Sequence, residues 1–334
     1  MNLPIKECPV SRHSFHSLLI ATCTFMLFSA CNWVYDDRSN CSDGTWLKLF
    51  YSYNLLNVDA ISTQVNEVSI FAFDENNHFV SRIDIDSLAL HQAHFKVKMN
   101  LPDGKYNFII WSGLSDENFQ CSPVAERNSL CISVACDSGR QQNQKLTPLF
   151  YGCIENVSIS NQYQVLSVPL IKDTNSFSCL LQDKSNKILD KNDFLFVITS
   201  SNGHMDYQNL PTNASPVYYR PFHKETVELP GQNIVHTKLN TLRIMCDDDT
   251  QLSLKHLPSG QILMQIPLTQ YLLLSRIQNG SLNIEAQEYL DRQDLYTLIF
   301  FLDSSNNDYP TITPTMNVNG WNVRLNLTEL RPPQ

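Results

Sequence analysis

A cysteine near the N-terminus is the residue of this sequence best placed for covalent chemistry. Cys31 directly follows Phe28-Ser29-Ala30, and Phe28 ends an apolar run over residues 14–28 that a modestly basic leader precedes. Two small residues directly before a cysteine fit the narrow cleft of a lipoprotein signal peptidase, after which the thiol carries a thioether-linked diacylglycerol. We therefore predict that residues 1–30 are a lipoprotein signal peptide and that Cys31 is the lipidation site.

The alternatives to lipidation are an ordinary secretory signal that a chance cysteine follows, or a transmembrane anchor. The apolar run of about 15 residues is the length of a signal-peptide core, and it is shorter than the roughly 20 residues that cross a bilayer as a helix. The residue order resembles the bacterial lipobox, with Phe28 at a position where leucine is commoner. Acyl chains stabilise membrane binding by roughly 0.8 kcal/mol per buried methylene, so two or three chains would tether the protein to an envelope surface.

Histidine and aspartate residues occur at spacings that could bind a metal or perform acid–base chemistry. His91 and His94 could ligate a metal from one helix face, although no carboxylate or cysteine accompanies them at ligand spacing. Asp247–Asp249 could supply oxygen ligands to calcium, but the segment lacks the glycine and the following carboxylate of a known loop. Asp84 and Asp86 could form a carboxylate pair on one strand edge. We interpret all three sets as loop, turn or solvent-facing residues, and we expect no metal and no cofactor.

Signatures of catalysis and of nucleic-acid binding are missing from the sequence. There is no GxSxG, P-loop or GxGxxG motif, and the scattered Ser, His and Asp residues show no nucleophile elbow. A secreted hydrolase would need a triad or a convergent set of carboxylates in one pocket, so we expect no catalytic residues and no enzyme. Lys and Arg total 24 against 33 Asp and Glu, and the net charge of −9 argues against nucleic acid as a partner.

Two further kinds of covalent modification remain open. Asp86-Ser87-Leu88 matches a short acceptor pattern for bacterial O-glycosylation. Export to an oxidising compartment permits disulfides, and Cys121 with Cys131 or Cys136 is the favoured local bridge. The alternative is that most of these cysteines are buried free thiols. The cysteines that follow Cys31 are Cys41, Cys121, Cys131, Cys136, Cys153, Cys179 and Cys246.

Short alternating runs separated by polar turns predict a chain that is mostly β-strand. Val68–Phe73 alternates and stops at the turn cluster Asp74–Asn77, and every second residue of Trp321–Leu327 is apolar. Such a series of short strands indicates an all-β fold that packs as β-sandwiches. The other predicted strands are Tyr106–Trp111, Val165–Leu170, Phe177–Leu181, Phe194–Thr199, Thr241–Met245, Ile262–Ile266 and Tyr296–Leu302.

Two segments have a helical period, and one polar segment divides the chain. Apolar residues recur at helical spacing within residues 267–280, and a second short helix is predicted over Ala286–Asp294. We expect one or two short accessory helices, the first closing an end of a sandwich core; a membrane or partner helix is the alternative. Ile154–Gln164 is polar, and we therefore predict two domains, residues 31–160 and 161–334.

Several stretches of the chain carry a family resemblance. These stretches are Cys31–Cys41, Tyr51–Asn54, Val65–Asp74, Tyr106–Leu114, Val168–Asn175, Tyr271–Ser275, Gln287–Asp294 and Val318–Asn326. In this order they resemble the FimB-like minor fimbrial subunits, the anchor proteins of type V, or Bacteroidales-type, fimbriae. The chain departs from the family at Lys172-Asp173, where the family often has an Arg-Asn pair, and in its extra cysteines.

The resemblance implies two transthyretin-like β-sandwich domains, held at the outer membrane by the lipid on Cys31. It implies a fimbrial anchor at the cell surface that binds the shaft subunit, with control of shaft length as a further expectation. A shaft can grow when a strand of one subunit adds to an open sheet edge of the next, and we expect that edge in the N-terminal domain. The alternative is a surface lipoprotein that binds a host or glycan ligand through sandwich loops. An exposed aromatic face would favour it, but we expect Tyr218, Tyr219 and Phe222 to pack between strands.

Overall fold

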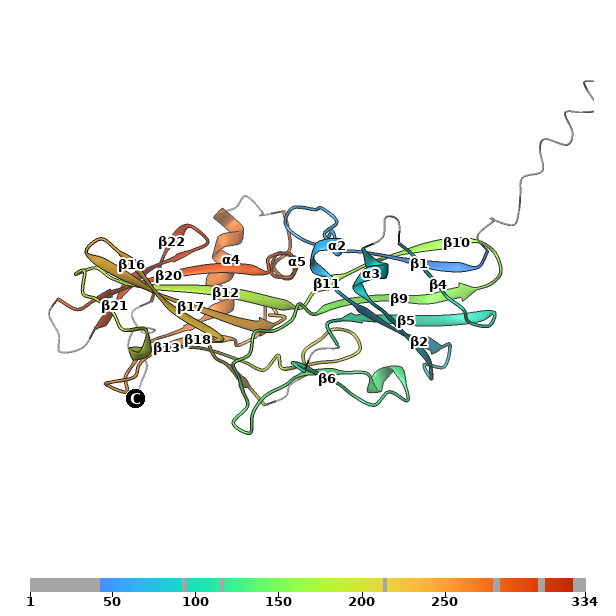
Figure 1. Cartoon of the computed structure of the whole chain (residues 1–334), viewed down its shortest axis with the longest axis horizontal. Coiled ribbons are helices and arrows are strands. Elements are labelled where there is room, and N and C mark those ends of the chain that lie inside the picture. The colour runs from blue at the N-terminus through green and yellow to red at the C-terminus, as the bar shows by residue number, and fades with distance from the viewer. Residues whose placement is uncertain are drawn as a thin grey trace, which may run out of the picture. The chain divides into compact units, whose positions relative to one another are not determined.

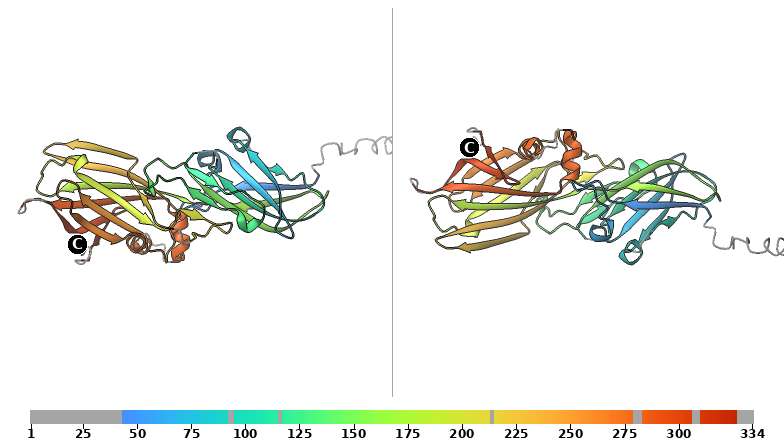
Figure 2. Two further views of the ribbon diagram at one scale, coloured as in Figure 1. Left: turned by 90° about the horizontal axis from the view of Figure 1, so that it is seen from below. Right: turned by 90° about the horizontal axis from the view of Figure 1, so that it is seen from above.

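The computed structural model covers most of the chain after residue 42 (Figures 1 and 2). Gly44–Gln334 forms one compact unit. Cys31 and the predicted signal peptide lie outside the described residues, so their prediction stays a prediction. The residues that the structure describes are 43–91, 95–114, 117–212, 215–278, 283–305 and 310–326.

Two sheets, whose strands all lie within residues 45–172, enclose one hydrophobic core, which includes Leu47, Ile70, Phe108, Ile110 and Phe150. Figure 1 draws most of these strands in blue to green. The smaller sheet has the order β10-β1-β4, with β10 (Gln164–Pro169), β1 (Thr45–Phe50) and β4 (Val97–Lys98). The larger sheet has the order β11-β9-β5-β2-β3, with β11 (Ile171–Lys172), β9 (Phe150–Ile159), β5 (Gly104–Ser112), β2 (Val68–Asp74) and β3 (Phe79–Ile85).

The central strands of the larger sheet are buried on both faces. Side chains alternate along a strand, so Ile70 and Ala72 of β2 pack in the first core while Phe71 and Phe73 pack in a second, larger core. Burial on both sides explains why β2 and β5 are almost continuously apolar instead of alternating with polar residues.

Three further sheets surround the larger core. The first has the order β16-β17-β12-β20-β21-β22, with β16 (His223–Leu229), β17 (Gln232–Leu242), β12 (Thr174–Asp183), β20 (Leu295–Asp303), β21 (Thr311–Val318) and β22 (Trp321–Arg324). The second has the order β19-β18-β13-β15-β8, with β19 (Ile262–Pro267), β18 (Gln251–His256), β13 (Phe194–Ser200), β15 (Val217–Tyr219) and β8 (Gln141–Gln142). The third has the order β14-β7-β6, with β14 (His204–Met205), β7 (Ile132–Val134) and β6 (Phe119–Cys121).

Both predicted accessory helices are present, and α4 lies against the larger core. α4 (Leu268–Gln278) begins directly after β19, and its buried Leu268, Tyr271 and Leu272 belong to that core (Figures 1 and 2). α5 (Ala286–Arg292) is the second. The short helices that the sequence did not predict are α2 (Ile61–Gln64), α3 (Ser87–Leu90), and the 3-10 turns η3 (Arg127–Ser129) and η4 (Lys191–Asp193).

The all-β class and the sandwich packing are confirmed, with two corrections at strand ends. β17 ends at Leu242, so the strand predicted over Thr241–Met245 is wrong for its last three residues. β22 ends at Arg324, and Trp321 is half-exposed whereas Leu325 is buried, so the predicted single apolar face is not uniformly buried. In both places a polar or exposed residue interrupts the alternation on which the sequence prediction depends.

Strand pairing crosses the predicted domain boundary at residue 160. β10 and β11 come after that residue, yet they hydrogen-bond to β1 and β9 of the first half. β8 comes before it, yet β8 pairs with β15 of the second half. The division into residues 31–160 and 161–334 stays a prediction.

Polar contacts also join the first half of the chain to α5. The Arg292 guanidinium lies 4.1 Å from the centroid of the Tyr53 ring, and its Nη1 donates to Asn57 Oδ1 at 2.8 Å. Lys172 forms an ion pair with Asp294, directly after α5. These contacts tie the loop after β1 and the strand β11 to one short helix.

Candidate partner-binding site

The five-stranded sheet of the first half ends in a long edge strand, β3. It pairs with β2 from Phe79 to Ile85. On its other side the Phe79 amide donates to the carbonyl of Ala125 at 3.0 Å, and His78 forms an isolated bridge with Glu126. Among the described residues no strand pairs with the rest of that side. An edge of this kind presents N–H and C=O groups to which another strand can add.

The side chains of β3 restrict which strands can pair with this edge. Arg82 Nε donates to Asp84 Oδ1 at 2.7 Å, and the Arg82 guanidinium lies 5.2 Å from the centroid of the Phe71 ring. Charges on an edge strand oppose indiscriminate pairing with other chains. On the opposite face, Ile83 and Ile85 pack on the first core but are only half-buried, so an added strand with apolar residues would cover them.

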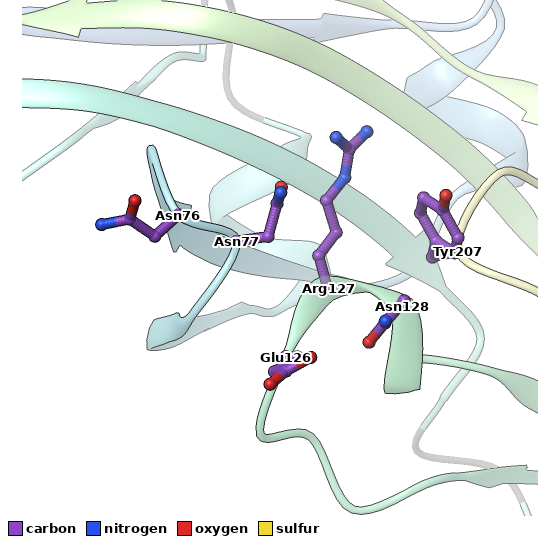
Figure 3. Close-up of a pocket in the computed structure, with 6 residues that line it drawn as sticks. All are labelled: Asn76, Asn77, Glu126, Arg127, Asn128 and Tyr207. Carbon is purple, nitrogen blue, oxygen red and sulfur yellow. The ribbon is translucent and has the colours of Figure 1, made fainter.

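A polar pocket of about 250 Å³ lies beside the start of β3 (Figure 3). Arg127 stands between Asn77 and Tyr207 in Figure 3, with its guanidinium 5.3 Å from the centroid of the Tyr207 ring. The Arg127 amide donates to the carbonyl of Asn77 at 2.8 Å, which fixes η3 against the β2–β3 turn. These groups can exchange hydrogen bonds with a hydroxyl-rich ligand. The lining residues are Asn76, Asn77, Glu126, Arg127, Asn128 and Tyr207.

A serine, a histidine and a glutamate form a hydrogen-bonded row across β12, β17 and β16. His236 Nε2 lies 2.7 Å from Ser178 Oγ, and His236 Nδ1 lies 2.7 Å from Glu225 Oε1. The hydrogen bond with His236 is the main reason why the pKa of Glu225 is lowered. The order serine, histidine, carboxylate is that of a hydrolase triad.

The main-chain amides beside this row are already used in the sheet. β12 is hydrogen-bonded to β17 on one side and to β20 on the other, so its amide groups around Ser178 are committed to the sheet. Acyl transfer needs donors aimed at the developing oxyanion, commonly main-chain amides. The sequence did not predict this row, because Ser178 and His236 are brought together only by the register of two antiparallel strands.

A second polar network is buried beside α5. Arg243 donates to both carboxylate oxygens of Asp291, each at 2.7 Å, and its Nη1 donates to the carbonyl of Asn209 at 2.6 Å. Asn209 Nδ2 donates to Asp173 Oδ1 at 2.9 Å. Burial raises the pKa of Asp173 to about 7, against the smaller opposing effect of Arg243. The other side-chain oxygens of Asp173 and Asn209 have no partner among the described residues.

The acidic residues that the sequence singled out do not form one site. Asp84 pairs with Arg82, whereas Asp86 caps α3 by accepting from the Ala89 amide at 3.1 Å, so the two are not a carboxylate pair. Asp248 accepts from Ser200 Oγ at 3.0 Å, and burial raises its pKa. No group of His, Cys, Asp and Glu residues in the part of the chain that the structure describes is placed to hold a metal ion.

The histidine and aromatic residues that the sequence singled out do not gather into a described site either. His91 Nε2 lies 3.2 Å from the carbonyl of Val65, and His94 lies outside the described residues. Tyr219 is fully buried and donates to Asn202 Oδ1 at 2.8 Å, while Tyr218 is exposed and Phe222 half-buried. The three aromatic residues therefore do not form the exposed face that a loop-bound ligand would use.

The cysteine predictions are corrected as well. Each of the six cysteines in the described part of the chain is a free thiol, so the local bridge from Cys121 to Cys131 or Cys136 is not present. Of the six, Cys179 is buried, whereas Cys136 and Cys246 are exposed. The alternative of free thiols is confirmed for these six cysteines, although only Cys179 among them is fully buried. Cys41 lies outside the described residues.

Solved structures of similar fold include proteins of Bacteroides and Porphyromonas. A candidate polysaccharide-binding protein of Bacteroides thetaiotaomicron is 28% identical with a TM-score of 0.77, over 86% of this chain and 100% of that chain. A candidate adhesin of the same species is 24% identical with a TM-score of 0.76, over 85% and 98%. The fimbrial anchor protein Mfa2 of Porphyromonas gingivalis is 17% identical with a TM-score of 0.67, over 85% and 100%. The last two show the shared fold.

Within the described residues, no helix has both the length and the apolar character to cross a membrane.

A sequence family covers most of the chain, although a search of curated proteins gives no match. Residues 38–327 match the family described as fimbrillin-A associated anchor proteins Mfa1 and Mfa2. The chain therefore belongs to this family of fimbrial anchor proteins, which confirms the resemblance seen in its sequence.

Proposed function

We propose that this chain is an outer-membrane lipoprotein that anchors a fimbrial shaft to the cell surface through a lipid on Cys31. Membership of the anchor family over residues 38–327 carries the proposal. The lipobox-like order before Cys31 supplies the means of attachment. Acyl chains would hold the protein on the membrane while its sandwiches remain outside. The chain would also limit shaft length, because a fixed subunit ends the growth of the polymer.

Retention of fimbriae on the cell tests the anchoring role. Deleting the gene should release fimbriae into the medium, and the fimbriae should be longer than those of wild type in electron micrographs. A Cys31→Ala variant should reproduce the release, because the protein would lose its acyl chains. Fimbriae that stay on the deletion strain at normal length would contradict the proposal.

We propose further that the shaft subunit adds a strand to β3. Among the described residues no strand pairs with its outer side beyond Phe79, and the half-buried Ile83 and Ile85 offer apolar contacts next to the main-chain groups. Main-chain hydrogen bonds would supply affinity, and the Arg82–Asp84 pair would restrict which strand can add. This places the docking edge in the first half of the chain.

Photo-crosslinking from two matched edge positions tests the docking edge. Val80 on β3 is 41% exposed, and Val227 on β16, the edge strand of the six-stranded sheet, is 38% exposed. A photoreactive amino acid at Val80 should capture the shaft subunit in cells, and the same amino acid at Val227 should not. Capture from Val227 alone would move the docking edge to β16, and equal capture from both would contradict specific strand addition.

We propose that the protein is not an enzyme, despite the Ser178–His236–Glu225 row. The main-chain amides of β12 around Ser178 are hydrogen-bonded within the sheet, so they are not available as oxyanion donors. A fluorophosphonate probe should therefore fail to label Ser178 in the intact protein, as judged by mass spectrometry. Labelling that disappears in a His236→Ala variant would show an activated serine and would overturn this view.

Carbohydrate binding is a second candidate function, and the pocket beside β3 favours it. Amide, carboxylate and guanidinium groups gather there next to one tyrosine ring, and a 28% identical solved protein is a candidate polysaccharide binder. Binding on a glycan array should be lost in Arg127→Ala and retained in the control Arg82→Ala, whose arginine lies on β3 outside the pocket. No glycan binding by the wild type would remove this candidate.

A further inference from the structure

The outward face of the small sheet β10-β1-β4 is rich in lysine. Along β1, Leu47 and Leu49 are buried, so the intervening Trp46 and Lys48 point away from the core. Lys98 lies directly opposite Trp46 in the antiparallel pair of β1 and β4. Lys96 lies two residues before Lys98, so its side chain is on the same side of the sheet. Three ammonium groups therefore share one side of a three-stranded sheet.

Aromatic rings hold two of these lysines in place. Lys96 Nζ lies 4.8 Å from the centroid of the Trp46 ring and 4.9 Å from that of Tyr163, and it donates to the Tyr163 hydroxyl at 2.8 Å. Lys98 Nζ lies 5.9 Å from the Trp46 ring. Tyr163 is 51% exposed and Val165 beside it is 39% exposed. The face thus combines cations with exposed aromatic and apolar groups.

The cations of this face contrast with the charge of the whole chain. The net charge is −9, yet the sequences of β1, β4 and β10 contain no Asp or Glu. The nearest acidic residue along the chain is Asp43, which precedes β1. A chain with a net negative charge does not acquire a cationic face from its amino-acid composition alone.

The chain enters the sheet beside this face. The Gly44 amide donates to the carbonyl of Asn161 at 3.2 Å, and the Gln164 amide donates to the carbonyl of Gly44 at 3.1 Å. These bonds fix the start of β1 next to Tyr163. The segment from Cys31 to Thr45 would span at most about 50 Å when fully extended, so a lipid on Cys31 would hold the protein near a membrane without orienting it. A tethered face gains effective concentration and needs only weak affinity of its own.

We propose that the lysine face, defined as Lys48, Lys96, Lys98, Trp46 and Tyr163, docks on the anionic phosphate headgroups of the membrane that holds the anchor. Lysine ammonium groups bind such headgroups, and Trp and Tyr are enriched where membranes meet water. Docking would orient the protein with the small sheet toward the membrane. This inference rests on the proposed lipoprotein, but its ligand and its residues are separate from Cys31.

Vesicle binding by a protein without lipid tests the inference. The mature chain carrying Cys31→Ser is mixed with phosphatidylcholine vesicles, with and without phosphatidylglycerol, and the bound fraction is measured by flotation. We expect binding that depends on phosphatidylglycerol and weakens with salt. Replacing Lys48, Lys96 and Lys98 by Glu should weaken it at least tenfold.

The matched control changes the net charge equally at another place. Lys184, Lys187 and Lys255 are exposed lysines outside the small sheet. Their replacement by Glu should leave vesicle binding within about twofold, because they are not part of the lysine face. Equal losses in both variants, or no binding to anionic vesicles by the parent protein, would overturn the proposal. Thermal unfolding of each variant checks that it folds. If the triple Glu variant does not fold, a milder variant with Lys96→Gln and Lys98→Gln replaces it, and this variant should still weaken vesicle binding.

The two proposals fail separately. The assay contains neither a lipid on Cys31 nor a shaft subunit, so a negative result would leave lipidation and anchoring as they stand. Conversely, an anchor that proves not to be acylated would still bind anionic vesicles through the lysine face.

Discussion

Two charged networks around strand β17 have the same hydrogen-bond lengths and very different surroundings. Arg243 Nη2 and Asp291 Oδ2 are 2.7 Å apart, and so are His236 Nδ1 and Glu225 Oε1. The Asp291 side chain is only 4% exposed, whereas that of Glu225 is 44% exposed. Strand β17 carries His236 within its length, and Arg243 follows its last residue.

The comparison teaches that burial, and not distance, sets the energetic weight of each network. An exposed ion pair contributes about 0–1 kcal/mol because water and salt screen it. Removing one partner of a buried pair costs about 3–5 kcal/mol because the other charge stays buried and uncompensated. We therefore expect the Arg243 network, which joins α5 to the end of β17, to contribute more to stability than the His236 row.

Arg243→Met should produce the largest loss of stability. The substitution leaves the buried Asp291 carboxylate without its bidentate partner, so the free energy of unfolding should fall by about 3–5 kcal/mol. Urea unfolding followed by circular dichroism measures it. Arg82→Met is the control, because the Arg82–Asp84 pair is exposed and should contribute about 0–1 kcal/mol. Similar losses in both variants would contradict the comparison.

Asp173→Asn should instead stabilise the protein at high pH. The folded state keeps a proton on Asp173 up to a pKa of about 7, whereas an ordinary carboxyl has lost it above 3.8. The folded state therefore binds more protons between these values, and wild-type stability should fall as pH rises through this window and level off above it. The asparagine removes this loss, worth up to about 4 kcal/mol above pH 7.

Unfolding curves of wild type and Asp173→Asn at pH values near 4, 6 and 8 measure the effect. The two proteins should have similar stability at the lowest pH and diverge as pH rises. Arg243 and Asp291 face the same site, the first favouring the charged carboxyl and the second opposing it. An asparagine variant that is less stable than wild type at every pH would show that Asp173 is ionised in the fold.

His236→Gln should have the smallest effect of the three. The glutamine loses the hydrogen bonds to Ser178 and Glu225 at a partly solvated position, so stability should fall by less than about 1 kcal/mol. The same urea titration measures it. A loss as large as that of Arg243→Met would mean that the exposed row supports the sheet, and the comparison would fail.

The sequence predicted those elements in which one residue type repeats with a clear period. The strand around Val68–Phe73 is largely apolar, as is the strand around Tyr106–Trp111, and α4 follows helical spacing. All three were therefore found within a few residues. β17 was missed over most of its length because its inward positions include the polar Asn233 and Thr237. Buried and more exposed side chains alternate along β17, but apolar and polar side chains do not.

The sites were harder to predict because they depend on register between distant strands. Lys48, Lys96 and Tyr163 are far apart in sequence and meet only because β1 lies between β4 and β10. Asp173 was noticed only as a departure from the family, and its burial could not be read from one residue.

Metabolic labelling with a clickable palmitate analogue tests the central claim most directly. Wild type and Cys31→Ala are labelled in the native host, fractionated, and subjected to a pull-down for fimbrial shaft protein. The account predicts label and membrane retention that depend on Cys31, together with co-purified shaft subunit. Label without any shaft partner would favour the ligand-binding lipoprotein, and wild-type protein without label would contradict the lipid-held anchor.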